Sequence, residues 1–394
     1  MVQKVILVGF IFAIVKRIID DKLGKAAKDK VISLLSILGL GYFSTSNLSW
    51  KWLTVYLLFV TAHYFYTHSE LMKLKKILSP IFVPLLFIFF VKYVSSVWGQ
   101  SNSNISIYFL GISYVSFKMS LYAHFYKFKE IRAESLFEYF CYVMFLPSLF
   151  VGPITKPHVF FSLWRSPEGI NCNNVAIFER ILVGLVKFTL LSQFFNQTTF
   201  TELIPSNQSY EIVHLFISGA SYYLFLYFNF SGFCDIVIAI GLLARVDLGE
   251  NFNRPYISRN IQEFWKRWHI TLSDFMNTVV FVPLNLYLMR RVGRKYHSLV
   301  TLLCISITFI LIGYWHGKDS QYLWFGCLQA FAVGVNFLWG IILKKYLSKK
   351  VYRRYFKSKI VYFISFLLSF IYMSFCFVIF GNDLKKLSEI WTSL

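Results

Sequence analysis

Residues 249–273 read GENFNRPYISRNIQEFWKRWHITLS, and residues 313–317 read GYWHG. The first stretch is dense in polar and charged residues, although the chain around it is mostly apolar. Both stretches place a histidine directly after a tryptophan: His269 follows Trp268, and His316 follows Trp315. We therefore expect these two stretches to bring polar chemistry into an otherwise apolar body.

The composition of the chain is that of a membrane protein. Its 394 residues are 57% hydrophobic and 20% aromatic, and the mean hydropathy is +0.56. Soluble domains are about 45–50% apolar, and a water-soluble fold has no room to hide so many aromatic rings. We predict an all-α, polytopic integral membrane protein, with residues 1–394 forming a single membrane domain.

Apolar segments recur along the whole chain. A helix needs about 20 residues to cross a bilayer, and several segments are shorter, which favours some re-entrant or half-helices. We expect roughly ten to twelve membrane helices, together with short amphipathic ones. The segments are 5–19, 28–43, 48–66, 77–98, 105–123, 136–151, 177–195, 212–230, 233–246, 299–315, 322–343 and 360–380.

The net charge of +21 comes from short basic clusters between these segments. Such clusters are typical of cytoplasmic loops and of contact with anionic lipid, so they do not indicate nucleic-acid binding. It stays open whether some of these loops also bind an acidic partner or a phosphate-bearing cofactor. With the clusters inside, the N-terminus and His316 lie toward the outside, as do the polar segments 44–49, 100–104 and 196–211. The clusters are 16–30, 73–76, 127–132, 290–295 and 344–359.

A short helix is predicted around His269. Asn260 can cap it, and Glu263 three residues later suggests a capping box. An apolar stripe at helical spacing ends near His269; its members are Ile261, Phe264, Trp265, Trp268 and Leu272. The pattern alone favours an interfacial helix at the membrane surface. The alternative is a helix that lines a cavity with His269.

His316 ends an apolar run between Gly313 and Gly317. Ionisable groups in membrane segments are costly and often functional, although a histidine at a helix end can also reach water or cap carbonyl groups. A neutral imidazole can take a proton from a hydroxyl at physiological pH. Tyr314 and Trp315 are candidates to shape a pocket around it, and the glycines to let the chain turn or a substrate approach.

Asp235 is an acid in an apolar run, and an ion pair with a nearby arginine such as Arg245 or Arg254 is the favoured interpretation. Alternatively, Asp235 orients a histidine. The six cysteines form no CxxC pair and no Cys/His ligand spacing, so no disulfide framework and no metal site are predicted. The remaining histidines are interpreted as interfacial or structural: His63, His68, His124, His158, His214 and His297.

Several motifs, in order and spacing, resemble the membrane-bound O-acyltransferase (MBOAT) superfamily, in particular its bacterial branch of alginate O-acetyltransferases and D-alanyl transfer proteins. The likeness spans about residues 105–340. The chain departs from the family at Met276-Asn277-Thr278, where Arg-Asp-Tyr is usual. The motifs are LGISYVSFK from Leu110, FLPSLFVGPI from Phe145, FSGFCD from Phe230, ENFNRPY from Glu250, EFWKRWHITLS from Glu263 and GYWHG from Gly313.

The resemblance implies membrane helices around a funnel, with His316 as the catalytic base and His269 as the second histidine. It implies transfer of an acetyl or D-alanyl group from a thioester to a hydroxyl of an envelope polysaccharide or teichoic acid, in the bacterial cytoplasmic membrane. No tightly bound cofactor is implied; the donor is acyl-CoA or an acylated carrier protein. An extracytoplasmic SGNH-type or DltD-like partner and membrane lipid complete the system. The predicted substrate-binding residues are Trp315, Asn251, Asn253, Trp265, Trp268 and Asp235.

Two rival functions remain open. A transporter or flippase shares the polytopic body and the intramembrane polar residues, but transporters often have repeated halves, and none is visible here. A catalytically silent membrane scaffold is the other rival, against which the intact Trp315-His316 pair argues. No nucleophile elbow, phosphate-binding P-loop or HExxH motif is present.

Overall fold

The computed structural model describes residues 2–44, 50–70, 79–98, 111–166, 173–199 and 212–382. Within these ranges the regular elements are helical, as predicted. The polar segment 100–104, most of 44–49 and 196–211, and the basic cluster 73–76 lie outside the described residues.

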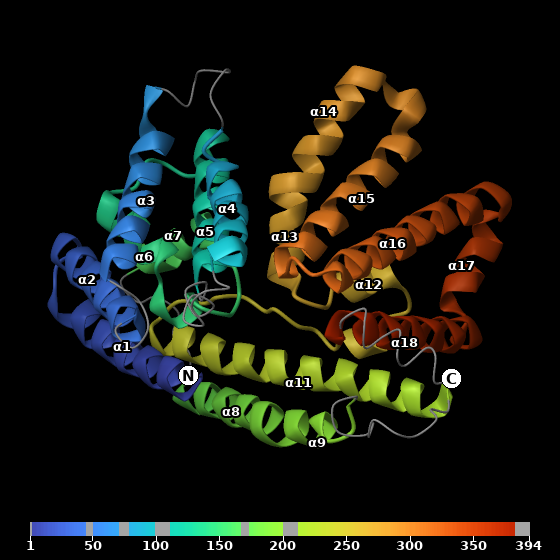
Figure 1. Cartoon of the computed structure of the whole chain (residues 1–394), viewed down its shortest axis with the longest axis horizontal. Coiled ribbons are helices and arrows are strands. Elements are labelled where there is room, and N and C mark those ends of the chain that lie inside the picture. The colour runs from blue at the N-terminus through green and yellow to red at the C-terminus, as the bar shows by residue number, and fades with distance from the viewer. Residues whose placement is uncertain are drawn as a thin grey trace. The chain divides into compact units, whose positions relative to one another are not determined.

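The helices follow one another without intervening strands in the described ranges (Figure 1). Their bounds are α1 Val2–Lys22, α2 Lys25–Ser44, α3 Trp50–His68, α4 Val83–Trp98, α5 Ile112–Lys127, α6 Leu136–Val143, α7 Pro157–Arg165, α8 Asn174–Leu185, α9 Ser192–Asn196, α11 Ile212–Leu243, α12 Ile261–Trp265, α13 Ile270–Met276, α14 Val282–Val292, α15 His297–His316, α16 Ser320–Tyr346, α17 Lys349–Lys357 and α18 Lys359–Gly381.

The chain divides into two compact units. Unit 1 comprises residues 1–184 and 233–250, and unit 2 comprises residues 185–232 and 251–394. Helix α11 therefore begins in unit 2 and ends in unit 1. A single membrane domain over 1–394 stays a prediction, because a division by packing does not define domains that fold separately.

Helix α5 is the core of unit 1. It packs against α3, α4, α6 and α7, and its residues from Tyr114 to Phe125 are buried. Gly111 precedes the helix with a left-handed φ of 91°, and a Cβ there would lie 3.2 Å from the carbonyl oxygen of Leu149. Glycine is thus required where the chain enters α5.

Helix α6 is shorter than the predicted apolar segment 136–151. Ser135 and Glu138 form a capping box at its start. The helix ends at Val143, and a 3₁₀ turn over Leu146–Ser148 follows. Pro147 lies in that turn and cannot donate a backbone hydrogen bond to continue an α-helix.

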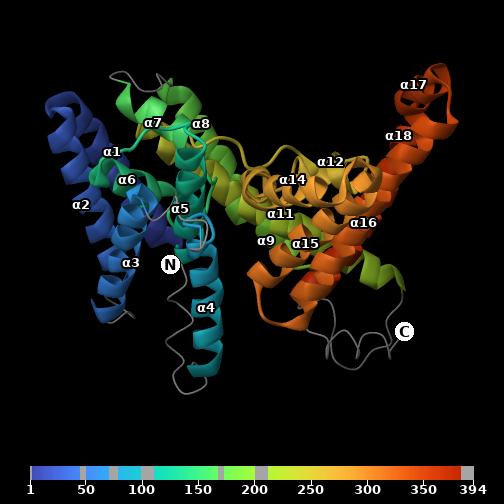
Figure 2. The same ribbon diagram turned by 90° about the horizontal axis from the view of Figure 1, so that it is seen from above.

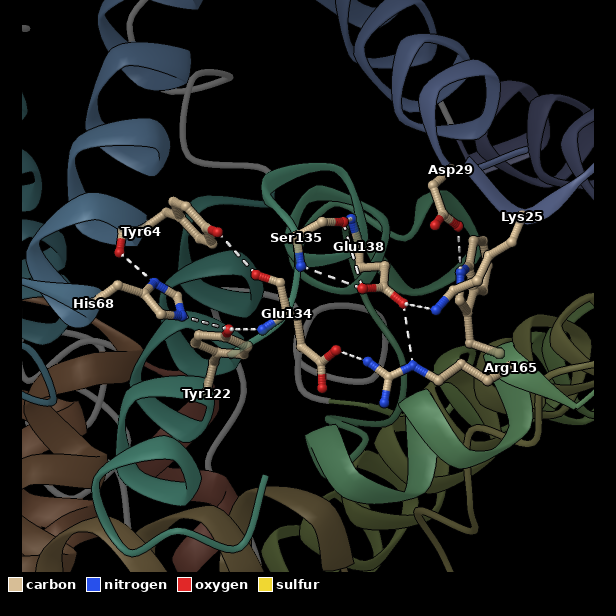
Figure 3. A network of polar contacts seen from close by, with 10 residues as sticks. Lys25, Asp29, Tyr64, His68, Tyr122, Glu134, Ser135, Glu138 and Arg165 are labelled. Carbon is tan, nitrogen blue, oxygen red and sulfur yellow. Dashed lines mark hydrogen bonds and ion pairs between the residues drawn. The ribbon is translucent and has the colours of Figure 1, made fainter. Parts of the chain in front are cut away.

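A network of charged side chains, centred on two buried carboxylates, joins the ends of these helices in unit 1 (Figure 3). Arg165 forms ion pairs with Glu134 and with Glu138, the latter at 3.1 Å. Lys25 of α2 reaches Glu138 at 3.0 Å. The side chains of Glu134 and Glu138 are only 2% and 7% exposed, so these cations are the partners that compensate for the removal of the two carboxylates from water.

Five helical segments of the described chain are long and apolar enough to cross a membrane. The expected total of ten to twelve membrane helices stays a prediction. The five segments are Leu215–Leu243, Ile270–Val292, Arg294–His316, Ser320–Tyr346 and Lys359–Gly381.

The first of these segments corrects the sequence analysis. Residues 212–230 and 233–246 were expected as two segments, but α11 continues through Ser231 and Gly232 to Leu243. A glycine inside a helix costs only about 1 kcal/mol, which the burial of neighbouring side chains such as Phe233 offsets.

The sequence analysis did not predict Ile270–Val292 as a membrane segment. Its polar residues Asn277 and Asn285 and its proline, Pro283, lower its apolar signal. The segment remains helical because a π-helical turn over Asn277–Phe281 lies just before Pro283. A local π turn is one of the adjustments that let a helix accommodate a proline.

In unit 2, helices α15 and α16 pack closely against each other. A Cβ on Gly313 would lie 2.4 Å from the carbonyl oxygen of Tyr322, and a Cβ on Gly326 would lie 2.6 Å from that of Phe309. Glycines at the crossing let the two backbones approach closely. Helix α17 joins the far end of α16 to the start of α18 (Figure 2).

Candidate active site

The helix predicted around His269 is two helices. Asn260 caps α12 as predicted, since its side chain accepts a hydrogen bond from the backbone N–H of Glu263 at 2.9 Å. The carboxylate of Glu263 accepts from the backbone of Arg259 rather than Asn260, so the capping box is incomplete. Helix α12 ends at Trp265, and His269 adopts a left-handed φ of 44° before α13 begins. The prediction of one continuous helix from Ile261 to Leu272 was therefore wrong.

The conformation of His269 is held by the segment 251–253. The backbone N–H of Ile270 donates to the carbonyl of Asn251, and the N–H of Asn253 donates to the carbonyl of Arg267, both at 2.9 Å. These two bonds satisfy backbone groups where the helix is interrupted. The motif beginning at Glu250 and the motif beginning at Glu263 thus form one local structure.

The side chain of Asn251 fixes the tautomer of His269. Its Oδ1 accepts from the backbone N–H of Thr271 at 3.2 Å, and because a backbone N–H can only donate, the facing atom is the amide oxygen. The same Oδ1 lies 3.1 Å from Nδ1 of His269, so Nδ1 carries the proton. In the neutral ring, Nε2 then has the free lone pair.

Aromatic rings enclose the buried His269 ring. Phe230 of α11 packs edge-on against it, with ring centroids 4.9 Å apart. Phe252 lies between Phe230 and Trp268, at 5.0 and 5.1 Å. Burial lowers the pKa of His269, and the charge of His316 lowers it further, so His269 is neutral at physiological pH.

Trp265 and Trp268 are both buried. The indole Nε1 of Trp265 donates to Oε1 of Gln329 in α16 at 3.1 Å. The ring of Trp268 stacks on Phe264 at 5.5 Å and lies 5.2 Å from Phe377 of α18. The two tryptophans therefore anchor the interrupted helix to α16 and α18.

His316 is the last residue of α15 and is partly exposed. Its ring lies 4.6 Å from that of Trp315 and 5.0 Å from that of Phe380, which it meets edge-on. Tyr322 lies 6.3 Å away and nearly parallel. Tyr314 is 47% exposed. Trp315 is thus a motif residue that contacts the ring.

The surroundings of the two histidines are continuous. Phe325 lies 6.4 Å from His316 and 5.7 Å from Phe377, and Phe377 in turn contacts Trp268. The charge of His316 is close enough to affect the pKa of His269. Residues distant in the sequence are thus brought into one aromatic-lined region of unit 2.

The two glycines beside His316 have a packing role. A Cβ on Gly317 would lie 2.3 Å from the ring of Tyr322, and Gly313 accommodates the backbone of that same residue. Gly317 has an extended φ of −174°, which any residue can adopt. The space beside both glycines is therefore filled by α16.

Asp235 lies in unit 1, whereas the other predicted site residues lie in unit 2. Asp235 pairs with Arg180 of α8 at 3.1 Å, and Arg180 also contacts Glu250 at 2.6 Å. Arg245, one of the expected partners, pairs instead with Asp21. An ion pair is confirmed, with a different arginine from those named; a substrate-binding role for Asp235 stays a prediction.

Asn253 is exposed and lines a polar pocket beside α12, and His269 is not among the residues that line this pocket. The sequence analysis missed Thr271 and Gln329, which contact Asn251 and Trp265. Gln329 was detectable as a polar residue within an apolar span. Met276 lies at the end of α13, and Asn277 and Thr278 begin the π-helical turn. Among the described residues, no group of three or more His, Cys, Asp or Glu side chains is arranged to hold a metal.

Comparison with known proteins finds relatives whose names all describe acyl-transfer proteins. A peptidoglycan O-acetyltransferase of Helicobacter pylori is 32% identical over 203 residues, 50% of this chain and 37% of that protein. A teichoic acid D-alanyltransferase of Bacillus subtilis is 28% identical over 231 residues, 57% of this chain and 58% of that protein. A probable alginate O-acetylase AlgI of Pseudomonas aeruginosa is 27% identical over 242 residues, 58% of this chain and 43% of that protein.

The chain spans about half the length of these curated relatives. The profile of MBOAT, the membrane-bound O-acyltransferase family, matches residues 36–379 and thus reaches from α2 to near the end of α18. This match confirms the resemblance seen in the motifs. Together with the apolar helices, it shows that this multi-pass membrane protein belongs to the membrane-bound O-acyltransferase family.

Proposed function

We propose that this chain transfers a short acyl group, acetyl or D-alanyl, from a thioester to a hydroxyl. The acceptor is a cell-envelope polysaccharide or teichoic acid, or a partner protein that passes the group on. The observation that carries the proposal is the convergence of His316 and His269 in one aromatic-lined region, with His269 held as a single tautomer. The names of the relatives support the same two acyl groups.

His316 is the general base in this proposal. Its neutral imidazole takes the proton of the acceptor hydroxyl while the oxygen attacks the thioester carbonyl. The carbon–sulfur bond then breaks, and the imidazolium returns the proton to the departing thiolate. General base catalysis supplies about 10²–10⁴-fold, and an activated donor needs little more than this help and correct placement.

His269 positions the reacting groups. Since its Nδ1 is bound to Asn251, its Nε2 can accept a hydrogen bond from the acceptor hydroxyl or from protonated His316. Trp315 lies beside His316 and is placed to contact the acyl group. Trp265 and Trp268 form the buried wall, and Asn253 faces the side from which we propose that the donor approaches.

The proposed setting is the bacterial cytoplasmic membrane. Acyl-CoA or an acylated carrier protein delivers the thioester on the cytoplasmic side, and an extracytoplasmic SGNH-type or DltD-like partner completes the transfer. The basic helix α17, with Lys349, Lys350, Arg353, Arg354 and Lys357, supports a cytoplasmic face in contact with anionic lipid.

The test is covalent transfer by the full chain in lipid nanodiscs or vesicles. Radiolabelled acetyl-CoA and a radiolabelled D-alanyl carrier protein are supplied in separate reactions with an envelope-glycan acceptor. We expect label that survives denaturation and is released from the acceptor by mild base, as an ester is. If the label crosses the vesicle membrane without becoming covalently attached to the acceptor, the protein is a transporter. If no donor gives either covalent transfer or passage of label, the protein is a scaffold. Either result contradicts the proposal.

A further inference from the structure

Helix α17 connects α16 to α18, and none of its nine residues is buried (Figure 1). Leu347 and Ser348 separate it from α16, and Ser358 alone separates it from α18. Both neighbouring helices are long and apolar enough to cross a membrane. Helix α17 therefore lies where the chain leaves one membrane span and enters the next, which is a bilayer surface.

The two faces of α17 differ in chemistry. Val351, Tyr352, Tyr355 and Phe356 recur at the spacing of one helix face, and of these Val351 and Phe356 are 50% and 46% exposed. A helix with one apolar and one basic face is suited to lie in the plane of a bilayer surface. The opposite face has five cations and no acid: Lys349, Lys350, Arg353, Arg354 and Lys357.

Helix α17 has little stability of its own. Helices shorter than about 12–15 residues are marginal in water. Its first two residues, Lys349 and Lys350, oppose the helix dipole, which favours acidic side chains at this end. The hydroxyl of Ser348 caps the helix with a long hydrogen bond, accepting from the N–H of Val351 at 3.4 Å. An anionic surface beside the two lysines would remove this conflict with the dipole.

The chain supplies no such surface among its described residues. The five cations of α17 are exposed, and within the described ranges none of them pairs with a carboxylate. Lys344 and Lys345 at the end of α16 and Lys359 at the start of α18 extend the same basic surface. Basic segments next to membrane helices attract anionic lipids, and each cation near the bilayer adds to the attraction. Charge complementarity thus favours phospholipid phosphates as the partner.

Both neighbours of α17 contribute to the candidate active site. In α18, Phe377 contacts Trp268 at 5.2 Å, and Phe380 meets His316 at 5.0 Å. In α16, Gln329 accepts a hydrogen bond from Trp265 at 3.1 Å. The position of α17 at the bilayer surface therefore constrains two helices that contact the residues around both histidines.

A second set of contacts lies closer to α17. Tyr362, in the first turn of α18, donates to the carbonyl of Ile257 at 3.3 Å, and the guanidinium of Arg259 lies 5.7 Å from the centre of its ring. In α16, Oδ1 of Asn336 accepts from the first N–H of α12 at 3.0 Å. Through these contacts α16 and α18 hold the chain that enters α12, and α12 leads to His269.

We propose that α17 binds the headgroup phosphates of anionic phospholipids, and that this contact holds α16 and α18 in the arrangement that acyl transfer requires. The lipid contact does not depend on the proposed function, whereas its effect on the transfer rate rests on that function. Lipid charge at the bilayer surface thereby regulates the candidate site.

The first experiment measures hydrogen exchange by mass spectrometry on the full chain in phosphatidylcholine nanodiscs, with and without phosphatidylglycerol. With the anionic lipid, we expect the backbone amides of residues 349–357 to exchange about tenfold more slowly, because the contact stabilises a marginal helix. The slowing should disappear at about 1 M salt, which screens charges over about 3 Å. Equal exchange in the two nanodiscs overturns the proposal.

The variant Lys349→Gln/Lys350→Gln should lose most of this slowing. If the lysines acted only on the helix itself, their removal would relieve the conflict with the dipole and slow the exchange, which is the opposite result. The matched control is Lys127→Gln/Lys129→Gln, an exposed pair in another basic cluster. It should keep the slowing, and equal loss in both variants overturns the assignment to α17.

The second experiment compares initial rates of acyl transfer in the same two nanodiscs. We expect phosphatidylglycerol to raise the rate about fivefold or more for the unmodified chain and for the control, but not for Lys349→Gln/Lys350→Gln. Slower exchange without this dependence of the rate overturns the coupling to the site. Absence of transfer in every nanodisc contradicts the proposed function, and the exchange measurement still decides the lipid contact.

Discussion

Two histidines of unit 1, His63 and His68, differ from His269 of unit 2 in how their rings are hydrogen-bonded. His63 is bonded at both ring nitrogens, with Nε2 2.9 Å from the carbonyl of Pro80 and Nδ1 2.8 Å from the hydroxyl of Tyr139. His68 is bonded in the same way to the carbonyl of Tyr64 and the hydroxyl of Tyr122 (Figure 3). His269 has one such bond, to Asn251, among the described residues.

This difference distinguishes a histidine with a structural role from one that is available for catalysis. A ring whose two nitrogens are both bonded to the protein helps to hold helices together and has no atom left for a substrate. A ring fixed at Nδ1 alone is oriented and still presents Nε2. The comparison predicts that disruption of the unit 1 network lowers stability, whereas disruption of the contacts of His269 lowers catalysis.

The largest stability effect is expected from Arg165→Met in unit 1. The change leaves the buried carboxylates of Glu134 and Glu138 without their shared cation, which costs about 3–5 kcal/mol. Thermal unfolding in detergent should show a large fall in the midpoint, with an unchanged transfer rate per folded molecule. Lys22→Gln, at an exposed position, should shift stability by no more than about 0.5 kcal/mol. Equal shifts for the two variants would show that the network is not structural.

Asn251→Leu should act in the opposite way. It removes the acceptor that orients His269 through Nδ1, so we expect the activation barrier to rise by about 1.4 kcal/mol, which is roughly a tenfold lower transfer rate. Asn251→Asp keeps an oxygen acceptor and should recover most of that rate. Nitrogen NMR of the histidine ring should show mixed tautomers in the leucine variant. A single unchanged tautomer there would contradict the role given to Asn251.

Gly313→Ala tests whether the glycines at His316 serve helix packing. Its Cβ would meet the carbonyl oxygen of Tyr322, and overpacking of this kind costs about 1–3 kcal/mol. Gly340→Ala is the matched control on α16, where a Cβ meets nothing within 4 Å. That variant should gain about 0.5–1 kcal/mol from helix propensity. Thermal midpoints that move in the same direction would refute the packing argument.

The smallest effect is expected from Tyr122→Phe. Its hydroxyl donates to His68 and accepts from the backbone N–H of Glu134, so its loss should cost about 1 kcal/mol. Tyr126→Phe is the control, because the hydroxyl of Tyr126 has no hydrogen bond among the described residues. Denaturation midpoints should fall for the first variant and stay near the wild-type value for the second.

The sequence predicted the apolar helices better than it predicted their interruptions. Apolar composition and segment length were enough to predict three membrane helices, since the predicted segments 299–315, 322–343 and 360–380 lie within α15, α16 and α18. The continuity of α11 through Gly232 and the tolerance of Pro283 depend on packing and on a π turn. Neither has a clear signal in local propensity.

The sequence predicted which residues form the candidate site, but it did not predict the contacts that these residues make. The motifs identified His269 and His316, but the left-handed backbone of His269 depends on a pairing with the segment 251–253 that spacing does not reveal. The partners Gln329 and Arg180 are more than fifty residues from the groups they bind. Side-chain pairing over such separations is set by the tertiary fold.

The measurement that tests the central claim most directly is the initial rate of acyl transfer by purified, monodisperse His316→Ala, compared with His63→Ala. Removal of a general base should lower the rate by about 10²–10⁴-fold, with a nearly unchanged thermal midpoint. His63→Ala should instead lower the midpoint and retain the rate per folded molecule. Transfer at the wild-type rate by folded His316→Ala would contradict the account.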